Sequence, residues 1–372
     1  MALAWSWVPH FWRDERSTIR TTHLPWNALW PFLKKRDAVH GAYYVLLHPW
    51  LAGFGSSQFA ARFPSAIAVA LAAAGVTVIA YYLEGPRAGI ISGLVMALLP
   101  VTSHYGMEAR SYALTCALVT WAGYCLLRAS AADGWWGWWV GYGVLLFASG
   151  GVFMYALLIG LAHSLTLVFA RVAVRVQLLV LGLVGIAISP LVLLASRQSG
   201  QVSWISRVIV GNAVDSPLSW VISVPQPHGG LSSAMSLLVR CAAILLGALL
   251  WVLVGKAVIS LWPRCEDRVD VLALALPWLL LPAAFLIMAS IARPMFVERY
   301  VFFSAPAFAL LIGYALAQLK QRTLIAGVAV LVLLAAPLWI ADRQPFSKSG
   351  VPKAKKVALM YSQPVREPGT VR

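Results

Sequence analysis

Residues 62–83, RFPSAIAVALAAAGVTVIAYYL, decide the class of fold. After Arg62 the run has no charged side chain, and it has the length of about 20 residues that a helix needs to cross a bilayer. Comparable apolar runs recur at roughly 86–104, 109–129, 135–150, 152–170, 174–195, 236–260, 269–291, 298–318 and 322–341. The roughly ten-residue alternation of a membrane β-barrel is absent from these runs. We therefore expect an all-α fold, a polytopic transmembrane helical bundle of about 10–11 spanning helices.

Composition supports this class. Hydrophobic residues make up 60% of the 372-residue chain and charged residues 11%, whereas a soluble domain has about 25% charged residues. So few charges cannot cover a folded chain in water, which excludes a soluble protein. The net charge of +16 fits the Lys and Arg excess in membrane-protein loops and their attraction to anionic lipid groups. We expect membrane lipid, and no nucleic acid, as a partner.

The chain divides into one membrane domain, residues 1–341, and a polar, basic tail, residues 342–372. Residues 1–12, MALAWSWVPHFW, are apolar but too short to span a bilayer, and we expect them to be the last part of a first spanning helix. Residues 13–55 form a first outer loop, and residues 62–341 hold the spanning helices. The sequence shows neither an internal repeat nor a soluble domain.

Two segments of the first loop favour helices that lie along the membrane surface. Residues 24–33 repeat Leu and Trp at helical spacing, which predicts an amphipathic helix in the interface plane. Residues 41–55, GAYYVLLHPWLAGFG, are apolar but too short to span. We expect both segments to be interfacial helices.

Loop charges predict how the helices are oriented. Basic residues fall at every second loop: Arg87, Arg128, Arg171, Arg175, Lys256, Arg264, Arg268, Lys320 and Arg322. The positive-inside bias makes that face cytoplasmic in an inner or plasma membrane. The extracytoplasmic face then carries residues 13–40, Arg62, residues 104–110, the Gly150 turn, the 196–235 loop, residues 293–299 and the tail.

The ionisable groups expected on the outer face include both carboxylates and cations. Asp14 and Glu15 are adjacent, in a chain with only 13 acidic residues. The other members are Arg16, Lys34, Lys35, Arg36, Asp37, His40, Arg62, His104, Glu108, Arg110, Arg293, Glu298 and Arg299. Structural ion pairs, such as Glu108 with Arg110 or Arg299, explain single members equally well, but they do not explain why the set gathers on one face. A carboxylate can take a proton from a hydroxyl, and Arg can bind phosphate through two parallel hydrogen bonds.

Five short motifs occur in an order that resembles a known group of membrane enzymes. They are Trp12-Arg13-Asp14-Glu15, Asp37-Ala38-Val39-His40-Gly41-Ala42-Tyr43-Tyr44, Phe59-Ala60-Ala61-Arg62-Phe63-Pro64-Ser65, Tyr105 through Tyr112, and Glu298-Arg299-Tyr300. Over residues 12–320 the chain resembles the bacterial GT-C-fold glycosyltransferases, which are related to protein O-mannosyltransferases and aminoarabinose transferases. The resemblance implies transfer of a sugar from a polyprenyl-phosphate donor to an extracytoplasmic acceptor. The chain departs from the family pattern at Gly41, where many relatives have proline.

The resemblance also implies roles for individual residues. Asp14 is the expected base or metal-linked residue, and Glu15 orients it or shares a divalent cation with it, Mg²⁺ or Mn²⁺. The cations expected to hold the donor phosphate are Lys34, Lys35, Arg110 and Arg299. The other residues expected at the donor phosphate or its pocket are Asp37, His40, Arg62, Glu108, Tyr112 and Tyr300.

Two alternative functions stay open at this point. A transporter or flippase for a lipid-linked sugar would use the same charges along a translocation path, and it predicts ionisable residues near the centres of spanning helices. The sequence has almost none there. The other alternative is a non-catalytic membrane protein of the cell envelope. The sequence indicates neither the sugar nor the acceptor, which is a glycan, a lipid or a protein.

Overall fold

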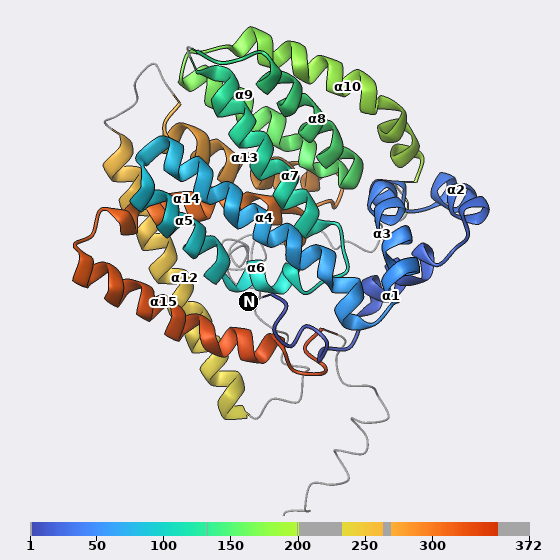
Figure 1. Ribbon diagram of the computed structural model, residues 1–372, viewed down its shortest axis with the longest axis horizontal. Coiled ribbons are helices and arrows are strands. Elements are labelled where there is room, and N and C mark those ends of the chain that lie inside the picture. Colours follow the sequence, from blue (N-terminus) through green and yellow to red (C-terminus); the bar gives the residue numbers. More distant parts are fainter. Residues whose placement is uncertain (1, 132, 199, 201–232, 263–268, 349–372) are drawn as a thin grey trace, which may run out of the picture.

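The computed structural model describes residues 2–131, 133–198, 200, 233–262 and 269–348, and these fold into helices joined by turns, with no strand among them (Figure 1). The helices are α1 (Arg13–Thr22), α2 (Trp26–Lys35), η1 (Ala38–His40), α3 (Gly41–Phe54), α4 (Gln58–Glu84), α5 (Pro86–Leu98), α6 (Pro100–Gly106), α7 (Tyr112–Ser130), α8 (Gly137–Val152), η2 (Met154–Leu157), α9 (Leu158–Phe169), α10 (Val174–Arg197), α12 (Ser233–Leu261), α13 (Val271–Ala292), η6 (Glu298–Ser304), α14 (Ala305–Ala317) and α15 (Gln321–Asp342). The predicted polytopic helical bundle is confirmed.

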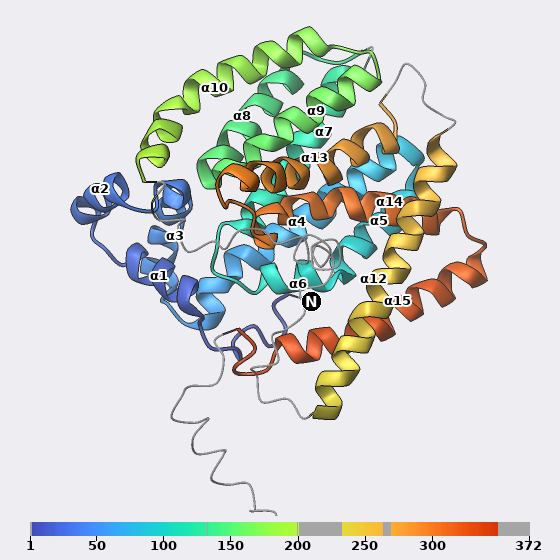
Figure 2. The same cartoon turned by 180° about the vertical axis from the view of Figure 1, so that it is seen from behind.

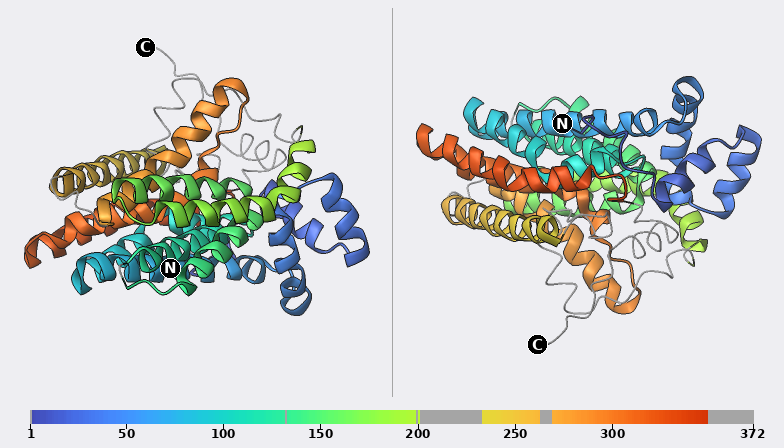
Figure 3. Two further views of the ribbon diagram at one scale, coloured as in Figure 1. Left: turned by 90° about the horizontal axis from the view of Figure 1, so that it is seen from above. Right: turned by 90° about the horizontal axis from the view of Figure 1, so that it is seen from below.

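The three short helices α1, α2 and α3 lie together at one end of the bundle, on the right in Figure 1 and on the left in Figure 2. Views from above and below show them projecting from that same end (Figure 3). α2 buries Leu29 and Leu33 and exposes Trp26 and Trp30, so it is amphipathic as predicted. α3 has 14 residues and is too short to span.

Every apolar run predicted to span the membrane is helical, but fewer than 10–11 helices have the length to do so. In the described part of the chain, seven segments are long and apolar enough to cross a membrane. They are α4, α7, α10, α12, α13, α15 and the continuous Glu298–Ala317 segment of η6 and α14. An eighth span would join α5 to α6, which are bent by 61° where Pro100 begins α6. Proline lacks a backbone N–H and breaks the helix there. The run at residues 135–150 forms α8, of 16 residues, and Met154–Phe169 is likewise short.

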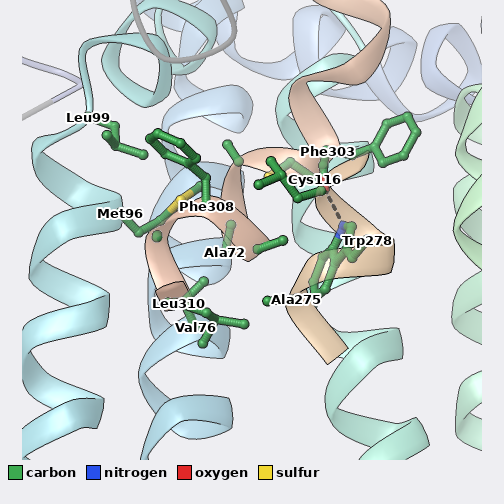
Figure 4. Close-up of a cluster of buried hydrophobic side chains, with 14 of the residues drawn as sticks. Ala72, Val76, Met96, Leu99, Cys116, Ala275, Trp278, Phe303, Phe308 and Leu310 are labelled. Carbon is green, nitrogen blue, oxygen red and sulfur yellow. Dashed lines mark hydrogen bonds between the residues drawn. The ribbon is translucent and has the colours of Figure 1, made fainter. Parts of the chain in front are cut away.

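The segment of η6 and α14 forms the centre of the bundle, and 94% of its most apolar window is buried. Trp278 of α13 packs against it and donates its indole N–H to the backbone oxygen of Phe303 at 2.8 Å (Figure 4). On the other side, Gly313 lets α14 approach α5, because a Cβ at this position would collide with Ser92. This packing fixes η6, which carries Arg299 and Tyr300 toward the α1–α3 end.

Basic residues of alternate loops lie at the opposite end of the bundle. Arg87, at the start of α5, donates to the backbone oxygen of Leu319, just past α14. Arg128, in the last turn of α7, lies over the rings of Tyr82 and Trp138, at 5.7 and 5.0 Å from their centroids. The helix ends therefore separate into the two faces that the loop charges predict.

The N-terminal residues and the segment after α15 pack on each other. Residues 2–7 form turns, where the end of a spanning helix was predicted for residues 1–12. Residues 343–348, predicted to belong to a polar tail, contact them: the backbone N–H of His10 donates to Pro345 at 2.8 Å. Residues 349–372 of the tail, and residues 201–232 of the predicted outer loop, lie outside the described residues.

Candidate active site

Segments that are distant in the sequence meet at the α1–α3 end of the bundle. Hydrogen bonds join α1 to the 107–111 loop and that loop to His40, and an ion pair joins Asp14 to Arg299. These segments are the ones that the alternation of loop charges predicts to share one face. The contacts confirm that they do.

Glu15 lies on the buried side of α1 and forms a salt bridge with Arg62 of α4. Arg62 donates from Nε to Oε1 and from Nη2 to Oε2, each at 2.8 Å, and both side chains are fully buried. Oε1 also accepts the backbone N–H of Ala109 at 2.9 Å, and Oε2 accepts that of Trp12 at 3.4 Å. Each carboxylate oxygen thus has two donors, so Glu15 is not available as a base or as a metal ligand.

Arg62 is equally committed to structural contacts. Its Nη1 donates to the carbonyl oxygens of Ser6 and Pro9 at 2.5 and 2.8 Å. With Glu15 on its other side, the guanidinium ties the N-terminal residues, α1 and α4 together. Arg62 was predicted to contact the donor phosphate, but its guanidinium is fully buried and uses four of its N–H groups for these structural contacts.

Asp14, one residue earlier, points to the open side of α1. Its side chain is 28% exposed, and Oδ2 lies 3.6 Å from Nη2 of Arg299. Asp14 lies in the first turn of α1, where the positive end of the helix dipole favours a carboxylate. Of the adjacent acidic pair, Asp14 alone has a carboxylate that a substrate can reach.

Arg299 lies between Asp14 and a group of aromatic rings. Its guanidinium carbon is 5.5 Å from the ring centroid of Trp12 and 5.7 Å from that of Tyr300. These cation–π contacts hold the guanidinium in place while its side chain stays 20% exposed. The predicted neighbours Arg299, Tyr300 and Tyr112 are brought together, since the rings of Tyr112 and Tyr300 are 6.4 Å apart.

Arg110 is the second cation of the site, and it connects α1 to His40. Its Nη1 donates to Thr18 Oγ1 at 3.0 Å, and its Nη2 lies 3.1 Å from His40 Nε2. Thr18 in turn donates to the backbone oxygen of Asp14 at 3.0 Å. Nε of Arg110 is buried and has no hydrogen-bond partner among the described residues. A buried cationic donor without a partner suits a ligand that brings oxygen acceptors.

His40 is neutral in this arrangement. A guanidinium can only donate, so Nε2 of His40 accepts from Arg110, and Nδ1 carries the proton and donates to Ser111 Oγ at 3.0 Å. Burial lowers the pKa of His40 well below its ordinary value of 6.5, and the charges of Arg110 and Arg299 lower it further. His40 therefore orients Arg110 without adding a charge.

Two aromatic residues of the site were missed from the sequence. The ring of Phe153 stacks on His40, with centroids 5.7 Å apart and planes at 8°, and it lies 5.4 Å from the ring of Tyr300. Tyr155 is also 5.4 Å from Tyr300. Both follow the break between α8 and η2. The available signal was the Gly150-Gly151 turn on the predicted outer face, followed directly by two aromatic residues in three positions.

The Lys34–Asp37 turn lies at the edge of the site. Lys34 and Lys35 are exposed in the last turn of α2. Asp37 has a φ of 56°, in the left-handed region, and Tyr44 donates to its carboxylate at 3.5 Å. Gln198 spans the turn: it donates to the carbonyl of Leu33 at 2.9 Å and accepts the N–H of Ala38 at 3.0 Å.

Glu108 belongs to a different cluster from the one predicted. Its Oε1 lies 3.2 Å from His104 Nε2 and 3.3 Å from Lys348 Nζ, and the side chain is 4% exposed. Burial raises the pKa of Glu108, but Lys348 and His104 more than offset this and hold it well below its ordinary range. Glu108 thus pairs with Lys348 and His104 rather than with Arg110 or Arg299.

The site does not fit a divalent cation shared by Asp14 and Glu15. All the acceptor positions of Glu15 face Arg62 or backbone N–H groups, and Asp14 faces the cation of Arg299. In the parts of the chain that the structure describes, no three His, Cys, Asp or Glu side chains are arranged to hold a metal ion. Arg110 and Arg299 supply the positive charge of this site.

Comparison with known proteins places this geometry in context. The family model for dolichyl-phosphate-mannose-protein mannosyltransferase matches residues 44–194, whereas none of the curated proteins matches the chain significantly. Apo ArnT from Cupriavidus metallidurans has a similar structure, with a TM-score of 0.59, 16% identity, and coverage of 90% of this chain and 61% of ArnT.

Two further solved structures are similar. ArnT bound to undecaprenyl phosphate gives a TM-score of 0.54 at 16% identity, covering 89% of this chain and 58% of that one. The apo oligosaccharyltransferase of Archaeoglobus fulgidus gives 0.51 at 16% identity, covering 88% and 51%. This chain has the GT-C fold. It spans about half to three fifths of the length of these GT-C structures.

The candidate site lies at an end of the bundle rather than inside it. In this chain the helices of the GT-C fold carry charged residues at the ends that surround α1, and α1 presents Asp14 to the open side. The central parts of α4, α7 and α14 pack through apolar and small residues. The charged residues of the site thus lie at the end of the bundle where α1–α3 lie.

Proposed function

We propose that this chain is a membrane glycosyltransferase that moves a sugar from a polyprenyl-phosphate donor to a hydroxyl-bearing acceptor. One observation supports this most directly: Asp14 is a solvent-reachable carboxylate next to Arg299, in a site where a second cation, Arg110, keeps an unpartnered N–H. A carboxylate base beside phosphate-binding cations is what transfer from a phosphate-linked sugar requires. ArnT from Cupriavidus metallidurans, which has a similar fold, has been solved bound to undecaprenyl phosphate, and this supports a polyprenyl-phosphate donor.

In the proposed reaction, Asp14 takes the proton of the acceptor hydroxyl as its oxygen attacks the anomeric carbon of the sugar. The bond between that carbon and the phosphate oxygen breaks, and its electron pair leaves with the polyprenyl phosphate. Arg299 and Arg110 stabilise the negative charge that develops on the leaving phosphate, because guanidinium groups bind phosphate oxygens bidentately. A single displacement of this kind inverts the anomeric configuration.

The aromatic residues around Arg299 suit a sugar. The rings of Tyr112, Phe153 and Tyr155 each lie 5.4–6.4 Å from the ring of Tyr300, measured between centroids. Aromatic faces pack against the apolar C–H faces of sugar rings, while tyrosine hydroxyls offer hydrogen bonds to sugar hydroxyls. We propose that these aromatic residues contact the sugar part of the donor.

The membrane orientation follows from the two ends of the bundle. Arg87 and Arg128 lie at the end opposite α1–α3, and the basic loop residues 171, 175, 320 and 322 belong to the same set. The positive-inside bias assigns that end to the cytoplasm. The site, and with it the acceptor, is then on the extracytoplasmic face of the inner or plasma membrane.

The test is transfer of label from a panel of radiolabelled polyprenyl-phosphate sugars to membrane-extract acceptors by the protein in liposomes. Wild-type transfer that Asp14→Asn abolishes would support the proposal and begin to identify the sugar. Movement of the donor between leaflets without transfer would instead establish a flippase. The ion pairs at helix ends, rather than at mid-membrane, favour the transferase.

A further inference from the structure

The segment after α15 folds back onto the loop that carries Arg110. Lys348 is 2% exposed, and its ammonium donates to the carbonyl of His104 at 3.0 Å, the carbonyl of Met107 at 3.2 Å and Oε1 of Glu108 at 3.3 Å. An ammonium has three N–H groups, so these three oxygens satisfy all of them. These three oxygens form a site, here called the cradle, that suits a compact cation. The ammonium of Lys348 occupies it.

The cradle lies at the C-terminal end of α6, where helix carbonyls lack partners within the helix. The negative end of the helix dipole also favours a cation there. Burying an ammonium costs several kcal/mol unless it is paired and fully hydrogen-bonded. Lys348 therefore stabilises the 104–108 backbone only in the conformation that presents all three oxygens.

That conformation continues directly into the site. The residue after Glu108 is Ala109, whose N–H binds Glu15 at 2.9 Å, and the next is Arg110, which binds Thr18 and His40. Only Ala109 separates the cradle from Arg110, and the backbone N–H of Arg110 donates to the carbonyl of Glu108 at 2.8 Å. The position of the Arg110 guanidinium thus depends on the backbone that Lys348 holds.

Two neighbouring contacts keep Lys348 in place. His104 bridges two carboxylates, with Nε2 3.2 Å from Glu108 and Nδ1 2.8 Å from Asp342 at the end of α15. Arg343 donates to Ser103 Oγ at 2.9 Å and to the carbonyl of Ala4 at 2.8 Å. These bonds fix Asp342 and Arg343, at the start of the segment that delivers Lys348.

We propose that Lys348 is a positioning residue: its ammonium acts as a built-in cation that sets the 107–111 loop and so aims Arg110 at the donor phosphate. The part about Arg110 and the donor rests on the proposed glycosyltransferase function. The part about the loop does not, and the two are measured separately.

The experiment uses full-length protein in liposomes and compares wild type, Lys348→Ala, Lys348→Met and the control Lys320→Met, which changes an exposed lysine at the other end of α15. The loop readout is amide hydrogen exchange of residues 105–112. The functional readout is KM for the donor against kcat. Propylammonium, which restores the atoms missing from Lys348→Ala, is then added, with tetramethylammonium, which has no N–H, at equal ionic strength.

We expect Lys348→Ala and Lys348→Met to speed loop exchange and raise KM for the donor by about tenfold or more, with kcat changed less. Propylammonium should restore both readouts in Lys348→Ala, and tetramethylammonium should restore neither. Wild-type exchange in both variants, or equal rescue by the two cations, would overturn the proposal. If wild type transfers no sugar, the proposed function fails, while loop exchange with and without propylammonium still decides whether Lys348 sets the loop.

Discussion

Asp14 and Glu15 are consecutive residues, yet their carboxylates face opposite surroundings. Glu15 is fully buried between Arg62 and two backbone N–H groups, whereas Asp14 is 28% exposed beside Arg299. The division follows from α1, which turns about 100° per residue and so places neighbours on different faces. One residue of the pair builds the site, and the other is placed to act in it.

Glu15→Gln should destabilise the protein strongly. The substitution keeps the size of the side chain but leaves the buried guanidinium of Arg62 without its counter-charge, which typically costs about 3–5 kcal/mol. Thermal unfolding in detergent should show a clearly lowered Tm. The control is Asp133→Asn, an exposed acidic residue between α7 and α8, for which Tm should stay at the wild-type value. A wild-type Tm in Glu15→Gln would contradict the structural role of the pair.

Arg299→Lys should weaken donor binding while the protein stays folded. Lysine keeps the charge, but it cannot make the two parallel hydrogen bonds of a guanidinium with phosphate, nor stack as well between Trp12 and Tyr300. We expect kcat/KM for the donor to fall by roughly 10- to 100-fold. The control is Arg175→Lys, at an exposed position in the first turn of α10. This variant should keep the wild-type kcat/KM. Unchanged kinetics in Arg299→Lys would remove Arg299 from phosphate binding.

The lowered pKa of His40 should make stability depend on pH. Folded His40 stays neutral below its ordinary pKa of 6.5, whereas in the unfolded chain it binds a proton as the pH falls through that value. The unfolded state then binds more protons, so the free energy of unfolding decreases as pH falls below about 6.5. His40→Asn, which cannot ionise, should flatten this part of the curve measured by thermal unfolding from pH 7.5 to 5. Parallel curves for wild type and variant would show that His40 is not the group responsible.

Gln198→Ala should loosen the Lys34–Asp37 turn and, through it, His40. The variant loses the bonds to Leu33 and Ala38, each worth about 1 kcal/mol. Hydrogen exchange of residues 33–40 should rise by about tenfold, and sugar transfer should fall by a smaller factor, because His40 still packs on Phe153. Gln318→Ala, exposed at the other end of the bundle, serves as the control. Protection that stays at the wild-type value would show that the turn holds without Gln198.

Much of the fold was predictable because the length of the apolar runs and the distribution of charges in the loops indicate it. The apolar run at 62–83 became α4, and the short segment 41–55 became α3. Among the described residues, the run at 86–104 is divided at Pro100 into α5 and a bent α6, and the runs at 135–150 and 152–170 form helices shorter than a span needs. Hydrophobicity reports which residues avoid water, and it does not report where a helix bends inside the membrane.

The sequence indicated which residues gather at the site, but it did not indicate which of them pair with each other. Charge type and order along the chain indicated that Asp14, Arg110 and Arg299 meet, and they do. The sequence could not show that Arg62 belongs to Glu15 or that Glu108 belongs to Lys348, because those partners are set by helix faces and by a segment 240 residues away. Phe153 and Tyr155 carry no charge and lie in an apolar run, so charge type could not indicate them.

The most direct measurement is label transfer by Asp14→Asn in the liposome assay, with a donor that wild type uses. The substitution keeps the size of Asp14 and removes its basicity, and loss of a general base typically lowers the rate by about 10²- to 10⁴-fold. We predict a loss in this range, in kcat and kcat/KM alike, at a wild-type Tm. Transfer at the wild-type rate by correctly inserted Asp14→Asn would contradict the central assignment, and the base would have to be sought elsewhere in the site.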